Sequence, residues 1–333
     1  MTIAVPSGTE HRLVASLGNV VSTTVNVDNF KRVESKTMIS RIVSIFGEQG
    51  VFHHDRELAP LDRQPVIRQN RDTLYSVAIV DVSTSATTLS IPDMGDRYIS
   101  VMVINQDHYI NRVFHSAGEY ELTKDEFGTD YLIVAARILF DPDSATDLDE
   151  VHRLQDELRL DAGTQHDFVY PDYDAASHQQ VREALLVLGR TMGGLAGCFG
   201  RAEEVDPVHH LVGTAMGWGG LPDAEASYLN IDPALPVGRY RMTFADVPAD
   251  AFWSVSVYNA AGYFEPDGSG ITNVNSVFAT REQDGSVIVH LGDFPVDTAN
   301  RIPLPDGWNL LIRLYRPRLE ELARWATPQI VPA

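Results

Sequence analysis

The stretch from Arg68 to Tyr75 concentrates polar side chains that could bind an anion. It reads Arg-Gln-Asn-Arg-Asp-Thr-Leu-Tyr and leads into an apolar segment with the character of a strand. Charges that enter a core must be paired, because their desolvation is costly. One interpretation is therefore a buried Arg–Asp network that locks the sheet to its neighbours. The other is an anion-recognising pocket wall, with Arg68, Asn70, Arg71 and Tyr75 as substrate-binding residues.

A second polar cluster, Asn105-Gln106-Asp107-His108-Tyr109, follows directly on an apolar run. The end of a strand is where rigid backbone meets solvent, so an acid–base group can be held there. We predict His108 as the base, oriented by Asp107 or another carboxylate, with Tyr109 as the third catalytic residue. The alternative is a histidine that only satisfies local hydrogen bonds.

Paired histidines at His209-His210 raise the question of a metal. Adjacent helical residues point about 100° apart, so at most one of the two faces a given pocket. If His108, His210 and a carboxylate converge, they could bind zinc or iron, which makes a divalent metal the candidate cofactor. The riskiest expectation is that His108 and His210, which belong to different parts of the sequence, approach one cavity. For His53-His54-Asp55, too, the sequence does not show which of the adjacent histidines faces a given pocket.

The usual local signatures of catalysis are absent from the sequence. There is no Gly-x-Ser-x-Gly elbow, His-Glu-x-x-His motif, phosphate loop or Gly-x-Gly-x-x-Gly turn. The acidic run at 141–150 lacks the central Gly and the final Glu of a calcium loop. The sequence therefore disfavours the common classes of hydrolase and nucleotide-binding protein.

The elements that must position these residues follow a β–α–β order. Apolar spacing predicts a helix over 28–47, with Asp28 as its N-cap, and helices within 145–216. In 252–258, alternation places Ser254, Ser256 and Tyr258 on one face of a strand. Turn signals separate the other predicted strands, at 74–82, 97–105, 119–122, 130–140, 239–246, 286–292 and 308–316.

Composition limits the partners. The 333 residues carry a net charge of −20, so a nucleic acid or an anionic membrane surface is an unfavourable partner, whereas a small-molecule ligand is not. The one cysteine, Cys198, excludes an internal disulfide. We see neither an export signal nor a long apolar run, so the cytoplasm is the expected location. A homo-oligomer stays open.

Long motifs over almost the whole chain resemble the family that pairs an N-terminal DUF1254 domain with a C-terminal DUF1214 domain. The resemblance implies a mainly β fold with a helical insert: an immunoglobulin-like β-sandwich, a helical segment and a jelly-roll-like β-sandwich. It implies candidate positions but no reaction, and among the residues of its motifs we add Trp218, Tyr258, Asn275 and Arg313 to the candidate substrate-binding residues. Two positions depart from the family's pattern, His209 for Arg and Leu221 for Asn. The motifs lie at 66–76, 107–109, 206–211, 217–220, 252–259, 262–264, 273–276, 307–309 and 313–317.

Pattern and resemblance together divide the chain into a helical lead-in (1–50), an N-terminal sandwich (51–142), a helical segment (143–222) and a C-terminal domain (223–333). We expect an enzyme that acts on a small organic substrate, for which an anion fits the arginines, by acid–base or metal-assisted hydrolysis or elimination in an inter-domain cleft. The alternative is a non-catalytic protein that binds a sugar or another small ligand through Trp218, Tyr258 and Tyr263. A structural or assembly role is the third hypothesis.

Overall fold

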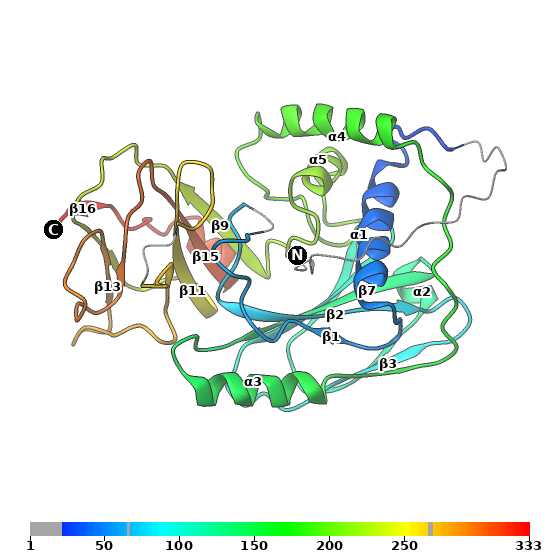
Figure 1. The fold of residues 1–333 in the computed structure, drawn as a ribbon, viewed down its shortest axis with the longest axis horizontal. Coiled ribbons are helices and arrows are strands. Elements are labelled where there is room, and N and C mark those ends of the chain that lie inside the picture. The colour runs from blue at the N-terminus through cyan, green and yellow to red at the C-terminus, as the bar shows by residue number, and fades with distance from the viewer. Residues whose placement is uncertain (1–21, 65–66, 266–268) are drawn as a thin grey trace.

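Two β-sandwiches lie side by side in the computed structural model, which describes residues 22–64, 67–265 and 269–333 (Figure 1). The first 21 residues of the predicted lead-in, Val66 of the first family motif and the predicted Asp267-Gly268 turn lie outside these ranges. A chain that is mainly β with a central helical segment is what the sequence predicted.

The N-terminal sandwich is antiparallel throughout. Its larger sheet has the order β1-β2-β7-β4-β5, and its smaller sheet has the order β6-β3-β8. Apolar side chains such as Leu74, Val101 and Val134 fill the space between the sheets. The strands are β1 (His53–His54), β2 (Thr73–Asp81), β3 (Thr87–Ile91), β4 (Ile99–Asn105), β5 (Ile110–Phe114), β6 (Gly118–Leu122), β7 (Tyr131–Leu139) and β8 (Arg159–Ala162).

Helices cover the other face of the larger sheet. In Figure 1, α1 (Phe30–Phe46), α4 (Ala175–Gly189) and α5 (Pro207–Gly217) lie on one side of β2 and β7, and α3 (Ala145–Glu157) lies on the opposite side. Asp174 and Asp206 cap α4 and α5. The short helices are α2 (Lys124–Phe127) and α6 (Leu319–Leu322).

The C-terminal sandwich packs two four-stranded sheets around its own core. In Figure 1 the sheet of order β12-β11-β15-β9 faces the N-terminal sandwich, and β13 and β16 lie on the far side. The strands are β9 (Ala226–Ile231), β10 (Tyr240–Phe244), β11 (Ala249–Tyr258), β12 (Asn273–Asn275), β13 (Val287–Leu291), β14 (Arg301–Ile302), β15 (Asn309–Pro317) and β16 (Val331–Pro332).

Strand β11 confirms the predicted alternation. Trp253, Val255 and Val257 enter the core of the C-terminal sandwich. Ser254 and Tyr258, on the other face, bond to residues of the N-terminal half. The strand therefore serves both as core and as the inter-domain wall.

Two expectations differ from the structure. Helix α1 begins after Asn29, not Asp28, and no side chain caps it. The segment 143–222 is not wholly helical, because β8 returns to pair with β3 in the N-terminal sandwich. Strand β8 alternates charged and apolar residues, but over only four positions directly after a helical spacing, so the sequence carried little signal for it.

Aromatic packing joins the two sandwiches. Tyr98 of the N-terminal half lies against Phe252 and Tyr315, with ring centroids 5.1 Å and 5.5 Å away. Trp218 and Leu221, which follow α5, belong to the same apolar cluster. The interface is thus a continuous core, and it is the place where polar residues from both halves meet. Across the described ranges, no helix has the length and apolar character needed to cross a membrane.

Candidate functional site at the inter-domain interface

Asp72 carries the buried network predicted at the start of β2. Its side chain is 2% exposed and accepts hydrogen bonds from Ser254 Oγ at 2.6 Å and Asn273 Nδ2 at 2.9 Å. Asn275 Nδ2 lies at 3.4 Å. Burial raises the pKa of Asp72, and the charge of Arg313 and these hydrogen bonds oppose the rise. All three donors belong to the C-terminal half, so this carboxylate joins the two sandwiches.

Arg313 strengthens the same junction. It is 2% exposed and donates to Ser256 Oγ, to the carbonyl of Arg68 and to Tyr258 Oη, each at 2.8 Å. Burial opposes its charge, but Tyr258, Tyr315 and Asp72 hold its pKa above the ordinary value. Arg313, Tyr258 and Asn275 were predicted to bind substrate; the structure places all three in contacts between the domains.

The other arginines of the motif are less buried than the network hypothesis requires. Arg71 is half-buried and donates to the carbonyl of Ala59 at 2.9 Å, and burial lowers its pKa. Its guanidinium has no carboxylate partner among the described residues. Arg68 is exposed, has a positive φ of 52° and donates to Asn309 Oδ1 at 3.1 Å.

His108 is fully buried, and both of its ring nitrogens are occupied. The N–H of Gly219 donates to Nε2 at 2.8 Å, and Nδ1 lies 2.8 Å from Thr214 Oγ1. Because Thr214 Oγ1 donates to the carbonyl of His210, the hydrogen between the two side chains belongs to Nδ1. Burial, with the charge of His210 second, holds the pKa of His108 well below its ordinary value. The ring is a neutral, satisfied hydrogen-bonding group.

The predicted companions of His108 have other partners. Asp107 forms an ion pair with Arg32, and Tyr109 Oη accepts a hydrogen bond from Lys31 at 2.8 Å. His108 and His210 do converge, with ring centroids 5.5 Å apart, but they lie in a stack of four rings that continues to Trp218 and to Tyr109. His210 Nδ1 is 2.8 Å from the carbonyl of Cys198.

The metal hypothesis finds no support in this geometry. Among residues 22–64, 67–265 and 269–333, no group of three His, Cys, Asp or Glu side chains is arranged to hold a metal ion. Burial lowers the pKa of His210, although the carbonyls of Cys198 and Asp107 oppose the effect. The two histidines instead hold α5 against the end of β4 through hydrogen bonds and ring stacking.

A line of polar side chains, which no sequence pattern predicted, crosses the larger N-terminal sheet. Tyr75 pairs with Arg137, and Arg137 pairs with Ser100. Asp55 donates its N–H to the carbonyl of Tyr75 at one end, and the β4–β5 register places His115 beside Ser100 at the other. Side chains at paired positions share a face, so we call Asp55, Tyr75, Arg137, Ser100 and His115 the polar row. It lies on the helix-covered face, where the same apolar cluster also includes Phe252 and Tyr315 of the C-terminal sandwich.

The middle of the polar row contains unpaired buried donors. Arg137 is 5% exposed and donates through Nη2 to the carbonyl of Gly219 at 3.0 Å, but its Nη1 has no partner. The hydroxyls of Tyr98 and Ser100 lie near each other and have no further partner. Burial raises the pKa of Tyr98, while nearby Ser100 and Arg137 oppose the rise. Orphaned buried groups call for a water, an ion or a ligand.

Tyr75 is the half-buried phenol next to this guanidinium. Its Oη accepts hydrogen bonds from Asn70 Nδ2 at 3.2 Å and from Arg137 Nε at 3.4 Å. Burial raises the pKa of Tyr75, but the charge of Arg137 and these hydrogen bonds outweigh burial, so the pKa is below its ordinary value. The site favours the phenolate more than water does.

Asp55 adds a second proton-exchanging group to the row. Burial raises the pKa of Asp55 to about 6, and its carboxylate has no hydrogen-bond or ion-pair partner in the described part of the chain. The adjacent His54 has its pKa lowered to about 4 by burial and by the charge of Arg56. Near neutral pH His54, which bonds to Ser76 on the opposite face of the sheet, is therefore neutral, and Asp55 is a carboxylate whose pKa lies close to that pH.

A groove of about 480 Å³ opens between the two sandwiches at the other end of the row. Tyr98 and His115 line its N-terminal wall, and Phe252 and Arg316 line its C-terminal wall. His115 Nε2 is 2.7 Å from Glu225 Oε2. Arg316 is exposed, holds a strained φ of 51°, and its side chain has no ion-pair or hydrogen-bond partner within the described ranges.

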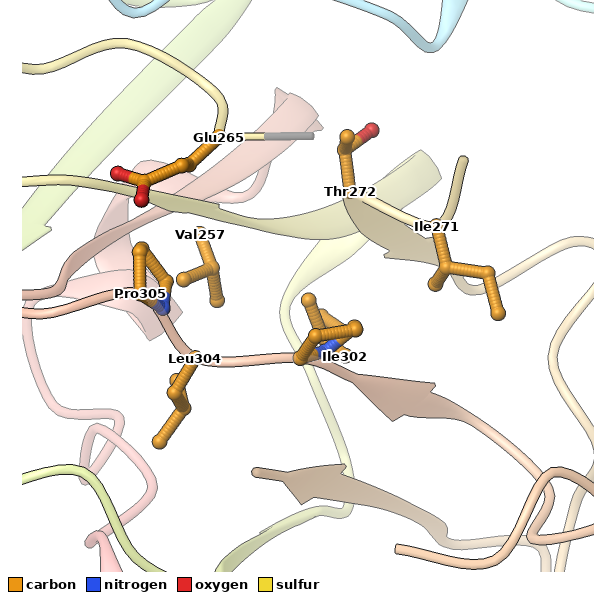
Figure 2. Close-up of a pocket in the computed structure, with 8 residues that line it drawn as sticks. Val257, Glu265, Ile271, Thr272, Ile302, Leu304 and Pro305 are labelled. Atoms are coloured by element: carbon orange, nitrogen blue, oxygen red, sulfur yellow. The ribbon is translucent and has the colours of Figure 1, made fainter. Parts of the chain in front are cut away.

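A smaller cavity of about 160 Å³ lies within the C-terminal sandwich. Figure 2 shows that its wall is mainly aliphatic, with Glu265 and Thr272 as the polar side chains. Glu265 accepts a hydrogen bond from Asn259 at 3.2 Å. None of the predicted site residues lines this cavity, and it offers no paired acid and base.

One signal in the sequence could have revealed the polar row. Arg137 is the single charge within the apolar run 131–140, and a buried arginine needs compensating partners. Which partners it finds depends on the register of β2, β7 and β4. That register is a long-range property that one-dimensional patterns do not give.

Comparison with known proteins agrees with this architecture. A family model described as "Protein of unknown function (DUF1254)" matches residues 49–134, and one described as "Protein of unknown function (DUF1214)" matches 227–319. A search of curated proteins found no match.

Two solved structures have a similar fold. The crystal structure of the VPA0106 protein from Vibrio parahaemolyticus is 16% identical, with a TM-score of 0.73, over 92% of this chain and 97% of that one. A putative uncharacterized protein from Burkholderia cenocepacia is 13% identical, with a TM-score of 0.51, over 92% and 87%. At these identities the likeness concerns the fold.

Proposed function

This chain belongs to the family that pairs an N-terminal DUF1254 domain with a C-terminal DUF1214 domain, and we propose that it is an enzyme that performs acid–base chemistry on a small organic anion between its two sandwiches. The observation that carries the proposal is the unpaired Nη1 of buried Arg137, next to the phenol of Tyr75. An anion-binding cation and a proton-exchanging group then lie side by side.

The charge balance supports an anionic substrate. In a chain of net charge −20, most of the arginines at the interface are matched by carboxylates or carbonyls. Arg137 Nη1 and the side chain of Arg316 are exceptions among the described residues, and they lie in the polar row and in the adjoining groove. A guanidinium with a free N–H in a dry setting binds carboxylates strongly.

Proton transfer is assigned to the polar row instead of to His108. Tyr75 and Asp55 have pKa values moved toward neutrality by Arg137 and by burial, respectively, and both are partly accessible. Hydrolysis and elimination each need such groups. The catalytic role predicted for His108, Asp107 and Tyr109 requires a substrate to displace existing hydrogen bonds, and the chemistry proposed here does not use it.

We assign His108 a positioning role. Its Nε2 accepts the N–H of Gly219, and the carbonyl of Gly219 accepts Nη2 of Arg137. The ring therefore fixes the backbone that aims the guanidinium.

The test is a turnover screen of the purified protein against esters, lactones, glycosides and β-substituted carboxylates. We expect activity on an anionic class, reduced at least about 100-fold by Arg137→Gln, since removing a transition-state donor has that order of effect. Arg137→Lys, which keeps the charge, should retain part of the activity.

The matched control is Arg112→Gln, which removes an exposed arginine of the same sheet, paired with Glu126. It should leave turnover unchanged. Turnover that is confined to neutral substrates, or that survives Arg137→Gln in folded protein, contradicts the proposal.

The alternative function, non-catalytic binding of a sugar or another small ligand, was expected to use an exposed surface of three aromatic side chains, and two of them are buried. Trp218 is buried and donates to Ser35 Oγ at 3.1 Å, and Tyr258 is fully buried. Only Tyr263 of the three aromatics reaches the surface, with 36% exposure. We further propose a cytoplasmic location and a small-molecule partner; the net charge of −20 disfavours a nucleic acid or an anionic membrane, and a single cysteine fits a reducing compartment.

A further inference from the structure

We infer that Arg137 binds the carboxylate of a small organic acid while Tyr75 removes a proton from the carbon next to that carboxylate. The inference rests on the proposed function and names its substrate class: an acid with a C–H bond α to the carboxylate. It is carried by the cross-strand pairing of Tyr75, Arg137 and Ser100 and by the unpaired donors at its centre.

The carboxylate subsite consists of Arg137 Nη1, Tyr98 Oη and Ser100 Oγ, all buried; Nη1 has no partner, and the two hydroxyls have none beyond each other. Ser100 is the direct cross-strand neighbour of Arg137, and Tyr98 lies two residues before it on the same face. These groups offer N–H and O–H donors and no carboxylate of their own. Two carboxylate oxygens, with four lone-pair positions, can satisfy all of them at once.

The proton acceptor is the Tyr75 phenol oxygen. It accepts two hydrogen bonds, from Asn70 and Arg137, and the guanidinium carbon of Arg137 is 5.3 Å from the ring centroid. An oxygen that already accepts two donors loses its own proton more readily. Since Tyr75 is half-buried, the proton it takes up can exchange with solvent. The charged or titratable groups that face it are Arg137, Arg313, Asp55, Tyr228 and Tyr315.

The step balances without a further reactant. The α C–H bond breaks, and its electron pair stays on carbon and spreads into the carboxylate as an enediolate. The proton passes to the Tyr75 phenolate, which becomes a phenol. Arg137 stabilises the charge that develops on the carboxylate oxygens, where a fixed cation in a dry site is most effective. Return of a solvent proton gives exchange at carbon, and loss of a β-substituent gives elimination.

The first test follows the α-hydrogens of lactate, malate and 3-hydroxybutyrate by proton NMR in deuterium oxide with the full-length protein. We expect protein-dependent loss of the α-hydrogen signal for at least one acid. Tyr75→Phe, which keeps the ring and removes the oxygen, should slow exchange at least about 100-fold. Tyr170→Phe, at a tyrosine that is 38% exposed, is the matched control and should exchange at the wild-type rate.

The second test reads the site without turnover, through the near-ultraviolet phenolate band. Arg137 lowers the pKa of Tyr75, so one tyrosine should ionise before the others and vanish from the titration in Tyr75→Phe. A bound carboxylate neutralises Arg137 and should move that ionisation to higher pH, as should Arg137→Gln. Arg137→Lys keeps the charge and should keep the early ionisation.

The outcomes separate the two proposals. No exchange with any of the three acids, together with Arg137-dependent turnover of another anion, overturns this inference and leaves the proposed function standing. Failure of all anions to move the Tyr75 ionisation means that the unpaired donors hold water only, which overturns both. Exchange that persists in Tyr75→Phe overturns the assignment of the proton acceptor.

Discussion

At the scale of single residues, Asp55 makes stability depend on pH. Its pKa is about 6 in the folded protein, against about 3.9 in an unfolded chain. The native state therefore holds the proton more tightly, and stability is lost as pH rises between these values. We expect Asp55→Asn to be more stable than wild type by about 2 kcal/mol above pH about 6, allowing for its partial exposure.

The measurement is urea unfolding of both proteins at several pH values. The difference should shrink toward zero below pH about 4, where Asp55 is protonated in both states. His54, whose pKa is lowered to about 4, destabilises both proteins in acid and largely cancels. Asp149→Asn, at an exposed aspartate, should show no such pH-dependent difference. A constant difference across pH would contradict the burial argument for Asp55.

Asp72 and its neighbour Arg71 should differ sharply in their effect on stability. Asp72→Ala leaves the buried Ser254 hydroxyl and the half-buried Asn273 amide without their acceptor and removes the negative charge near buried Arg313, so we expect a loss of about 3–5 kcal/mol. Arg71→Ala removes one hydrogen bond to the carbonyl of Ala59, for which about 1 kcal/mol is expected. If chemical denaturation gave equal losses of unfolding free energy for the two variants, Asp72 would not be the centre of the buried network.

The residue types in the sequence predicted a buried polar network at Asp72 but not the residues that hydrogen-bond to it. An Asp at the start of a buried apolar strand loses its hydration, and this loss is costly. We could therefore predict that Asp72 has hydrogen-bond donors around it. That its donors are Ser254, Asn273 and Asn275 depends on which sheet faces it. The same limit explains why Arg137 was missed and why His108 was read as a base.

At the scale of elements, His108 links the end of β4 to helix α5. We expect His108→Ala to lower the free energy of unfolding by about 2–4 kcal/mol, because it leaves a cavity within the ring stack and orphans the N–H of Gly219. Differential scanning calorimetry checks this. Unchanged stability together with abolished turnover would favour the original interpretation of His108 as a catalytic base.

Helices and strands were easier to predict than contacts between them, because the sequence patterns that mark a helix or a strand lie within that segment. Alternation located β11, turn signals bounded β15, and apolar spacing placed helices within 145–216, where α3 and α4 lie. The failures have local causes as well. Strand β8 is too short for its alternation to stand out, and α1 begins after Asn29, without the side-chain cap expected of Asp28.

At the scale of the whole molecule, the two sandwiches should unfold together. Tyr98, Phe252 and Tyr315 form one apolar cluster, and buried Arg313 bonds across the interface. We expect denaturation curves from Trp218, in the N-terminal half, and from Trp308, in the C-terminal core, to coincide when each is isolated by Trp→Phe changes at the others. Two separated transitions would show that the interface is weak and that the groove between the halves is not a fixed site.

Fold class and order of domains followed from turn spacing and from the family resemblance. The mutual placement of the two halves did not, because it depends on contacts between residues such as 72 and 254 that are far apart along the chain. The polar row exists only when β1, β2, β7, β4 and β5 align in register. The proposed site is thus a property of sheet assembly, which no single motif encodes.

The most direct test of the account is a crystal structure of the protein with lactate or malate bound. The account predicts a carboxylate within hydrogen-bond distance of Arg137 Nη1 and Tyr98 Oη, with the α-carbon turned toward Tyr75 Oη. An ordered water alone at Nη1, with the acid bound beside His108 or only in the outer groove, would contradict it.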